Sequence, residues 1–328
     1  MSNPSTRAIL ADLIAFDTVS RNSNLALIDY VRRYLAGYGI SSRLFHDAGG
    51  DKANLLAVIG PQDRPGIMLS GHTDVVPVDG QRWQSDPFAL TERDGKLYGR
   101  GTADMKSWLA AVLALVPRLC AAPLRLPVWL AFSYDEEVGC KGVHSLLAEL
   151  EHLPSQPAAC IVGEPTSMRP VLGHKGKIAV RCEVTGFACH SAYTPTGVNA
   201  IEYAVRIMQQ LMALAQTLHQ QQNLAFDPPF STLQTGVIAG GKALNIVPAH
   251  CQFDFEIRTL PPPAALQTVA FGTEGGLFQQ HGVPTLVCGP GAMDQGHKPD
   301  EFITLEQLQA CDAFMLRLCH WLQAAPGG

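Results

Sequence analysis

The stretch Gly66-Ile-Met-Leu-Ser-Gly-His72-Thr-Asp74 is a short apolar run that ends in an imidazole and a carboxylate. In a β-strand alternate side chains share a face, so His72 and Asp74, two positions apart, point the same way. A histidine that binds a metal ion commonly donates its other ring N–H to a carboxylate. The stretch therefore predicts a strand that ends at a metal site, with one residue of the pair as ligand and the other steadying it.

Similar short apolar runs, each bounded by Gly or Pro, alternate with helical patterns along the first half of the chain. The runs cover residues 54–59, 67–70, 128–133 and 160–163, and the helical patterns include residues 5–17, 24–38, 105–119 and 142–150. Strands that alternate with helices usually form a parallel sheet that the helices cover. The expected fold class is α/β, with a mainly parallel mixed sheet flanked by helices.

The pattern changes after residue 173. Alternating apolar runs and one long helical pattern follow, and a last helical pattern ends the chain; these segments are residues 178–184, 199–218, 232–238, 249–257 and 305–322. A chain of 328 residues exceeds the usual size of a single hydrophobic core. We therefore expect a larger domain of residues 1–173 and 271–328, interrupted by a smaller α+β domain of residues 174–270.

The composition disfavours several partner classes. Hydrophobic residues make up 47% of the chain, charged residues 16%, and the formal net charge is −5. These values indicate a globular protein whose partner is a small molecule rather than nucleic acid or an anionic membrane. No apolar signal core, no run of 18 apolar residues and no C-x-x-C pair among the nine cysteines occur. We therefore expect a cytoplasmic protein with buried free thiols and no membrane span.

Further side chains that can bind a metal or move a proton follow apolar runs or Gly-rich turns. They are Asp104, Glu136, Glu137, Glu164 and His297. Imidazoles and carboxylates without thiolates suit zinc, cobalt or manganese at a catalytic site. With His72 and one glutamate of the adjacent pair, the set offers five ligands. That is too many for one tetrahedral ion with an open position, but it suits two ions that share a carboxylate.

Each of these signals has an ordinary explanation. An acidic pair after a strand is usually a solvated loop, and a lone histidine is usually a hydrogen-bonded polar residue. Their joint occurrence at strand ends favours a metal site, because ligands gather outside the carboxyl ends of parallel strands. Spacing alone does not decide which of Glu136 and Glu137 faces the metal.

Four of these contexts resemble the motifs of one enzyme family. They are Ser70-Gly-His72-Thr-Asp74-Val-Val-Pro77, Tyr98-Gly-Arg-Gly-Thr-Ala-Asp104-Met-Lys106, Tyr134-Asp-Glu136-Glu137 and Gly163-Glu164-Pro-Thr166. The family is the aminoacylase, carboxypeptidase and deacylase group of dizinc amidohydrolases, and the resemblance covers nearly the whole chain. It implies a metal-dependent hydrolase of linear amides, whose smaller domain is a lid that also dimerises.

Four more stretches resemble one branch of that family. They are Ser133-Tyr-Asp-Glu-Glu-Val-Gly-Cys140-Lys-Gly142, His174-Lys-Gly-Lys177, Gly197-Val-Asn-Ala-Ile-Glu-Tyr203 and His297-Lys-Pro-Asp-Glu301. This branch hydrolyses N-acetyl-L-ornithine to acetate and L-ornithine for arginine biosynthesis, which is the function that the resemblance implies. The alternative within the class is a succinyl-diaminopimelate desuccinylase or another N-acyl amino acid deacylase, because these enzymes share the metal ligands.

The resemblance also assigns ligands to two divalent ions, expected to be Zn²⁺, with Co²⁺ as a substitute. One ion is held by His72 and Glu164 and the other by Glu137 and His297, with Asp104 bridging the two. Asp74 is implied to orient His72. Glu136 is implied as the general base, which takes a proton from the metal-bridging water that attacks the amide carbonyl and passes it to the departing amine.

Three residues of the smaller domain match further family positions. His190 matches a lid histidine that donates a hydrogen bond to the tetrahedral oxyanion and, in dimeric members, reaches across from the partner subunit. Asn245 and Arg258 match positions that hold the substrate carboxylate, for which a planar guanidinium is well shaped. Without the resemblance, all three are ordinary surface residues at turns or strand ends.

The chain departs from the family pattern between Arg258 and Phe271. Relatives carry several dozen residues there, which form a second lid helix and the last lid strand, whereas this chain has only residues 259–270. We therefore expect a shortened lid whose sheet has an uncovered edge, which invites self-association. A homodimer is expected if the lid is competent. The alternative of another class is a protein that binds metal but does not catalyse.

Overall fold

The computed structural model describes residues 4–171, 173–224, 226–260, 268–269 and 273–324. The chain divides into two compact units, one made of residues 1–172 and 273–328 and the other of residues 173–272. Both ends of the chain belong to the first unit, and the second unit is a single insertion in it. Among the described residues, no helix combines the length and hydrophobicity needed to cross a bilayer.

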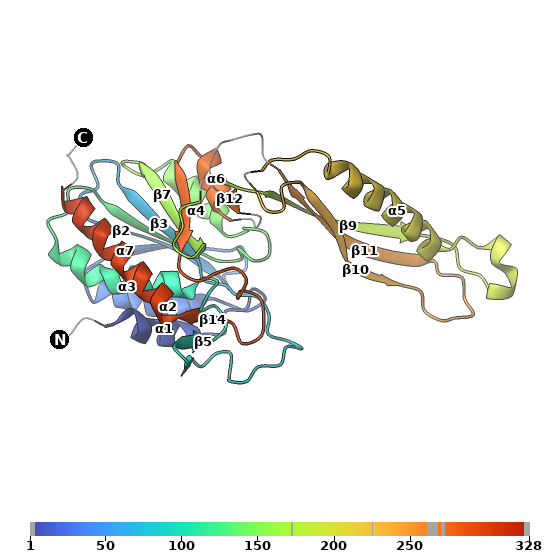
Figure 1. Cartoon of the computed structure of the whole chain (residues 1–328), viewed down its shortest axis with the longest axis horizontal. Coiled ribbons are helices and arrows are strands. Elements are labelled where there is room, and N and C mark those ends of the chain that lie inside the picture. The colour runs from blue at the N-terminus through green and yellow to red at the C-terminus, as the bar shows by residue number, and fades with distance from the viewer. Residues whose placement is uncertain (1–3, 172, 225, 261–267, 270–272, 325–328) are drawn as a thin grey trace. The chain divides into compact units, whose positions relative to one another are not determined.

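A six-stranded sheet of order β1-β2-β6-β3-β7-β13 forms the centre of the first unit (Figure 1). Its strands are β1 (Ser42–His46), β2 (Ala53–Ile59), β6 (Val128–Ser133), β3 (Ile67–His72), β7 (Ala159–Pro165) and β13 (Thr285–Gly289). The last four run parallel, whereas β1 and β2 pair antiparallel. Strands β3 and β6 are buried along their whole length, which explains why they read as continuous apolar runs. The predicted mainly parallel mixed sheet is confirmed.

Helices flank this sheet, and a small sheet of order β14-β5-β4 lies beside it. The helices are α1 (Thr6–Ile14), α2 (Leu25–Ala36), α3 (Lys106–Ala121), α4 (Val143–Leu150), α6 (Gly275–Gln280) and α7 (Leu305–Ala324); the short strands are β4 (Thr91–Arg93), β5 (Lys96–Tyr98) and β14 (Phe302–Thr304). Helices α1, α2, α3 and α7 share the main hydrophobic core with the sheet. Helix α4 packs against β2 and β6, and α6 against β7 and β13.

Helix α3 approaches the sheet most closely at Trp108. A Cβ placed on Gly163 of β7 would lie 2.0 Å from the Trp108 ring, and one placed on Gly71 of β3 would lie 3.1 Å from it. Only glycine allows the backbone to come this near to a large side chain. Because alternate side chains of a strand face opposite ways, His72 and Glu164, which follow these glycines, point away from α3.

The second unit contains an antiparallel sheet of order β10-β11-β9 with helix α5 packed on one face (Figure 1). Its elements are β8 (Gly173–His174), β9 (Gly176–Thr185), the 3₁₀ helix η1 (Ser191–Thr196), α5 (Ala200–Leu218), β10 (Thr232–Gly240), β11 (His250–Thr259) and β12 (Thr268–Val269). Strands β8 and β12 form a short parallel pair. The side chain of Asn199 caps α5 by accepting from the N–H groups of Ile201 and Glu202. The predicted three strands and one long helix are confirmed.

The close contact between Gly163 and Trp108 predicts that adding one methyl group at residue 163 destabilises the fold strongly. We expect Gly163→Ala to lower the free energy of unfolding by about 2 kcal/mol, because the helix or the strand must shift to admit the Cβ. Gly49→Ala is the matched control, since its Cβ would make only ordinary contacts at 3.4 Å. Chemical denaturation measures both changes, and equal stability of the two variants would contradict the prediction.

Candidate metal centre

The carboxyl ends of three neighbouring parallel strands deliver most of the predicted ligands to one place. His72 is the last residue of β3, Glu136 and Glu137 follow β6, and Glu164 lies near the end of β7. Since β6, β3 and β7 are adjacent and parallel, their carboxyl ends meet at the same edge of the sheet. Asp104 joins them from the start of α3.

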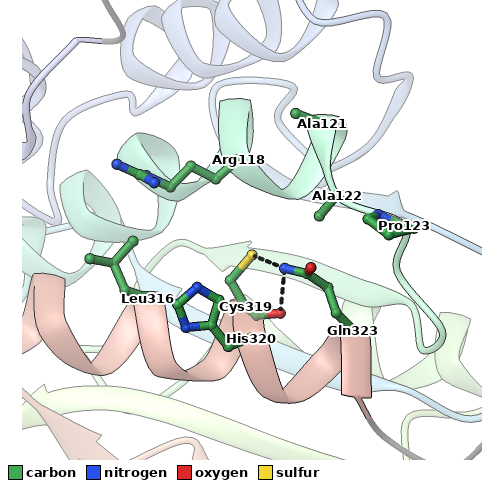
Figure 2. Close-up of a pocket in the computed structure, with 8 residues that line it drawn as sticks. All are labelled: Arg118, Ala121, Ala122, Pro123, Leu316, Cys319, His320 and Gln323. Carbon is green, nitrogen blue, oxygen red and sulfur yellow. Dashed lines mark hydrogen bonds between the residues drawn. The ribbon is translucent and has the colours of Figure 1, made fainter.

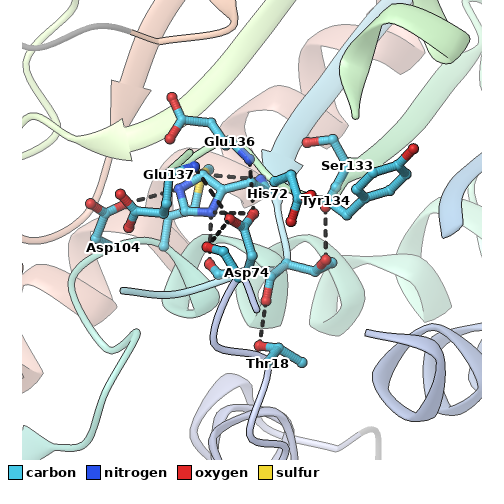
Figure 3. A network of polar contacts seen from close by, with 12 residues as sticks. Thr18, His72, Asp74, Asp104, Ser133, Tyr134, Glu136 and Glu137 are labelled. Atoms are coloured by element: carbon cyan, nitrogen blue, oxygen red, sulfur yellow. Dashed lines mark hydrogen bonds and ion pairs between the residues drawn. The ribbon is translucent and has the colours of Figure 1, made fainter. Parts of the chain in front are cut away.

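The imidazole of His72 lies at the centre of this group (Figure 3). Its Nε2 is 3.0 Å from Oδ1 of Asp104 and 3.9 Å from Oε1 of Glu164. Its Nδ1 is 2.9 Å from the backbone carbonyl oxygen of Asp74 and 3.5 Å from Oδ1 of the same residue. His72 is 1% exposed. The ring is therefore held on one side by Asp74 and offers Nε2 to the acidic group on the other.

The carboxylate of Asp74 has a second task, which is to hold the acidic pair that follows β6. It accepts hydrogen bonds from the Ser20 hydroxyl at 2.7 Å and from the backbone N–H groups of Glu136 and Glu137 at 3.1 and 3.2 Å. Burial alone would raise the pKa of Asp74, but His72 and these donors hold it below its usual value. Asp74 thus remains a carboxylate that fixes both His72 and the turn carrying the two glutamates.

His297 closes the group from the loop before β14. Its Nε2 is 3.2 Å from Oδ2 of Asp104 and 3.1 Å from Oε2 of Glu137. The side chain of His297 is 48% exposed, whereas those of Asp104 and Glu137 are 5% and 7% exposed. Asp104 therefore contacts an imidazole through each of its oxygens, His72 through one and His297 through the other.

The donor set fits divalent metal ions. Two groups have ligand atoms within 4.8 Å of one another, namely His72 with Glu136 and Glu164, and His72 with Asp104 and Glu137. One oxygen of Glu137 and one of Glu164 are buried without a hydrogen-bond partner in the described part of the chain. A buried carboxylate oxygen with no partner is costly unless a cation satisfies it. The residues present therefore fit a divalent metal site, and His72 is common to both groups.

The pKa values of the clustered side chains are shifted because several carboxylates are buried close to one another. Burial raises the pKa of Glu136 to about 8, and it raises that of Glu164 well above its usual value. Burial alone would raise the pKa of Asp104, but the two imidazoles hold it well below its usual range. Hydrogen bonds to Asp104 and Glu137 raise the pKa of His297 to about 10. Without metal, protons on these groups balance the carboxylates.

Glu301 is a supporting residue to which the sequence motifs gave no role. Its Oε1 accepts from the backbone N–H groups of Ala103 and Asp104 at 2.8 and 3.1 Å, and its Oε2 accepts from Arg100. Arg100 and Glu301 are both almost fully buried. Arg100 also donates to Gln81 at 2.7 Å. This ion pair fixes the backbone at Asp104; in the sequence, Glu301 appears only as the last residue of the stretch His297-Lys-Pro-Asp-Glu301, without a role of its own.

Glu274 is a second buried acid that the sequence did not reveal. It is 1% exposed at the start of α6, and neither of its carboxylate oxygens makes a hydrogen bond within the described residues. Burial raises the pKa of Glu274 to about 7, and the neighbouring Ser133 hydroxyl and His72 oppose that rise. The sequence offered only a single glutamate where the chain returns to the first unit.

The three predicted residues of the second unit do not all gather at one place. His190 lies at the start of η1, where its Nδ1 accepts from Ala192 N at 3.1 Å, and the carbonyl of Asn245 accepts from Ser191 N at 3.0 Å. Arg258 lies near the end of β11, where its Nε donates to Glu256 at 2.6 Å. Asn245 precedes β11, so about 25 Å of strand separates it from Arg258. One copy of this unit cannot place both on the same carboxylate.

A separate hollow of about 280 Å³ lies between the carboxyl-terminal turns of α3 and α7 (Figure 2). Its polar contacts are those of the Gln323 amide with the carbonyl and thiol of Cys319, at 3.3 and 3.6 Å. Helix α3 has 16 residues and starts beside Asp104, so its far end lies about 24 Å from the metal centre. This hollow carries no acidic cluster and is not the candidate site.

A model described as Peptidase family M20/M25/M40 matches residues 68–320. The chain belongs to this family. Acetylornithine deacetylase from Myxococcus xanthus is 35% identical, and the alignment covers 96% of each chain. The acetylornithine deacetylase of Pasteurella multocida (strain Pm70) is 34% identical over 92% of this chain and 94% of the relative. These findings confirm the resemblance and identify the chain as a metal-dependent amidohydrolase.

Solved structures of the family share the fold. An M20 family metallo-carboxypeptidase from Sulfolobus solfataricus has a TM-score of 0.81 at 15% identity, with 98% of this chain and 100% of that chain covered. A dinuclear metal-binding peptidase of the family from Bacillus subtilis has a TM-score of 0.62 at 14% identity, with 98% of each chain covered. At these identities the likeness establishes the fold alone.

The curated relatives contain residues that this chain lacks. The alignment with the Myxococcus xanthus enzyme runs over 373 positions, whereas this chain has 328 residues. At least 45 of the aligned positions are therefore gaps in this chain. The alignment length does not locate these gaps, so a shortening between Arg258 and Phe271 stays a prediction.

The buried ion pair of Arg100 and Glu301 predicts a large loss of stability when it is broken. We expect Glu301→Gln to lower the free energy of unfolding by about 3 kcal/mol, because Arg100 is left as a buried charge without its partner. Asp63→Asn is the matched control, since it removes an exposed partner of Arg64 and should change nothing measurable. Urea denaturation of the metal-free protein tests this, and an unchanged midpoint for Glu301→Gln would contradict it.

The raised pKa of His297 predicts that metal uptake releases protons. At pH 7 the metal-free imidazole is protonated because its pKa is about 10, so an ion that takes Nε2 must displace that proton. We expect the affinity for Zn²⁺ to increase as the pH rises toward this pKa. Calorimetry at pH 7 in two buffers of different ionisation enthalpy measures the release. On binding Zn²⁺, the variant His297→Gln should release about one proton fewer than the parent chain. If the parent chain gives the same heat of Zn²⁺ binding in both buffers, no proton is released and the prediction is wrong.

Proposed function

We propose that this protein hydrolyses N-acetyl-L-ornithine to acetate and L-ornithine, as a cytoplasmic step of arginine biosynthesis. The observation that carries the proposal is the name shared by the curated relatives. Those cited above are acetylornithine deacetylases, and they align over more than 90% of this chain. The gathering of His72, Asp104 and Glu137 at one edge of the sheet supplies a centre suited to that reaction.

We assign the centre to two Zn²⁺ ions, for which Co²⁺ can substitute. His72 and Glu164 would hold one ion, Glu137 and His297 the other, and Asp104 would bridge them. Two bound divalent ions would lower the pKa of a water molecule between them and polarise the amide carbonyl. The absence of thiolates from this donor set suits an open catalytic site rather than a closed structural one.

Glu136 is the proposed proton carrier. Its carboxylate would take the proton of the attacking water and deliver it to the amine as the carbon–nitrogen bond breaks, so that acetate and free L-ornithine leave. Its position supports this role, because the backbone of Glu136 is pinned by Asp74 while its side chain shares the acidic group with His72 and Glu164. In this assignment Asp74 acts only by holding other residues in place.

The lid residues complete the proposal and require two copies of the chain. His190 would donate to the oxyanion, while Asn245 and Arg258 would hold the substrate carboxylate. Because Asn245 and Arg258 lie far apart within one copy, a site that uses both must draw them from different subunits. We therefore propose a homodimer as the active form.

Two other readings remain as alternatives. A succinyl-diaminopimelate desuccinylase, or another N-acyl amino acid deacylase, would use the same metal ligands with a different acyl pocket. A metal-binding protein without turnover is favoured by the gap of at least 45 residues relative to the Myxococcus xanthus enzyme. Comparing the hydrolysis of acetyl and succinyl substrates distinguishes the deacetylase from the first alternative. Two bound metal ions per chain without hydrolysis of any acyl amino acid would establish the second.

The decisive experiment measures acetate release from N-acetyl-L-ornithine by the Zn²⁺-reconstituted protein. We expect turnover by the parent chain, little hydrolysis of N-succinyl-diaminopimelate, and a fall in kcat of about 10² to 10⁴ in Glu136→Gln and Glu136→Ala at unchanged metal content. Glu151→Gln, an exposed change just after α4, is the matched control. Activity of Glu136→Ala equal to the parent would remove the proposed mechanism, and two bound ions without turnover would favour the inactive alternative.

A further inference from the structure

The side chain of Gln81, in the segment between β3 and β4, contacts two regions that carry predicted metal ligands. Its Nε2 donates a hydrogen bond to the backbone carbonyl of His297 at 3.1 Å. Its Oε1 accepts hydrogen bonds from Arg100 at 2.7 Å and from the indole N–H of Trp83 at 3.1 Å. One amide group therefore holds the loop of His297 with its nitrogen and a buried guanidinium with its oxygen.

The guanidinium of Arg100 extends this connection to Asp104. Arg100 is fully buried and donates to the carboxylate of Glu301 as well as to Gln81. The other oxygen of Glu301 accepts from the backbone N–H of Asp104 at 3.1 Å. The side chains of Asp104 and His297 meet directly, with Oδ2 3.2 Å from Nε2. The contacts thus form a closed ring, which runs through Asp104, Glu301, Arg100, Gln81 and His297.

The loop of His297 has a backbone conformation that needs to be held. The φ angle is +63° at His297 and +54° at Asp300. Residues other than glycine rarely adopt this left-handed region, and they persist there where surrounding contacts hold them. The segment between β3 and β4 supplies such contacts: Gln81 bonds the His297 carbonyl, and the backbone N–H of Gln84 donates to Oδ1 of Asp300 at 2.9 Å.

The ring of His297 has less support than the ring of His72. The side chain of His72 is 1% exposed, and its Nδ1 lies 2.9 Å from the carbonyl oxygen of Asp74. The side chain of His297 is 48% exposed, and its contacts with Asp104 and Glu137 are both made by Nε2, the atom that would bind an ion. A ligating histidine is usually oriented through its other ring nitrogen. For His297, the orientation of the ring depends instead on its backbone.

We propose that Gln81 is a positioning residue of the metal centre. It fixes the backbone of His297 relative to that of Asp104, and so places the imidazole, without contacting an ion itself. This inference rests on the proposed role of His297 as a metal ligand and is independent of which amide is hydrolysed. Metal affinity is its readout, whereas acetate release is the readout of the proposed reaction.

A substitution of nearly equal size tests the proposal in the full-length protein. Gln81→Met retains the length of the side chain but removes both the donor to His297 and the acceptor for Arg100. We expect it to raise the dissociation constant for Zn²⁺ about ten-fold, at the site that His297→Gln also weakens. Competition with a chromophoric chelator at pH 7 measures this constant. Gln84→Met, the same change at an exposed residue of the same segment, is the matched control and should leave it unchanged.

A second substitution separates the contact with His297 from the contact with Arg100. Gln81→Glu retains an acceptor for Arg100 and Trp83, so the buried guanidinium stays paired and the fold is retained, but it removes the donor to the His297 carbonyl. Its added negative charge would strengthen cation binding, and Gln84→Glu adds the same charge nearby without removing that donor. We therefore expect Gln81→Glu to bind Zn²⁺ about ten-fold more weakly than Gln84→Glu.

A double-mutant cycle tests whether Gln81 acts through His297. His297→Gln removes the imidazole, so in that background Gln81→Met should cause no further loss of Zn²⁺ affinity. A spectroscopic measurement complements the cycle, because the visible absorption of bound Co²⁺ depends on the geometry of its ligands. The spectrum should change in Gln81→Met and stay as in the parent chain in Gln84→Met.

The outcomes either support the proposal or overturn it. Weaker Zn²⁺ binding in both Gln81 variants, with no further loss in the His297→Gln background, would support it. Unchanged affinity, or equal losses in the two backgrounds, would overturn it, because Gln81 would then not act through His297. A parent chain that binds no Zn²⁺ would overturn both this proposal and the metal centre, whereas bound Zn²⁺ without acetate release would contradict only the proposed reaction. Circular dichroism verifies the fold of each variant.

Discussion

The contact between the ring of Trp108 and the backbone of Gly163 is the constraint on which the first unit depends. It brings α3 down onto β7, while Gly71 allows the same approach over β3. Two consequences follow for the metal centre. The side chains after these glycines, His72 and Glu164, must point to the other face of the sheet, and Asp104, just before α3, is brought to the same edge. The packing of the hydrophobic helix α3 against the sheet thus determines the direction in which the polar side chains of the metal centre point.

The resulting cluster is electrostatically unfavourable on its own. Glu136, Glu137 and Glu164 are crowded and desolvated, and their raised pKa values express that cost. Protons on the imidazoles and carboxylates offset it in the metal-free chain, and divalent cations are the other means of balancing it. Within the described residues, one oxygen of Glu137 and one of Glu164 have no hydrogen-bond partner, so this crowded group is suited to binding cations.

The second unit follows a different logic. In the described part of the chain, α5 packs on one face of its sheet, and Ile178 and Val180 on that face are 48% and 36% exposed. Asn245 lies before the start of β11 and Arg258 near its end, so the length of the strand separates these two predicted substrate-binding residues.

The sequence predicted the architecture where the signals were strong. Buried strands such as β3 and β6 read as continuous apolar runs, and long periodic segments such as α5 stood out. Strands β1 and β13, the short strands of the small sheet and helix α6 were not predicted. These elements are short or only partly buried, so their own residues show no clear periodicity. Whether such segments become strands or helices depends on the elements that pack against them.

The candidate ligands were also chosen from sequence, because imidazoles and carboxylates at strand ends are chemically distinctive. What the sequence by itself determined is the residue types, their order and the family. Only the tertiary structure decided which atoms meet: that both oxygens of Asp104 contact imidazoles, that Asp74 holds the acidic pair, and that Glu301 and Glu274 are buried beside them. These contacts join residues distant in the chain, and no local pattern encodes a distance between segments that meet only after folding.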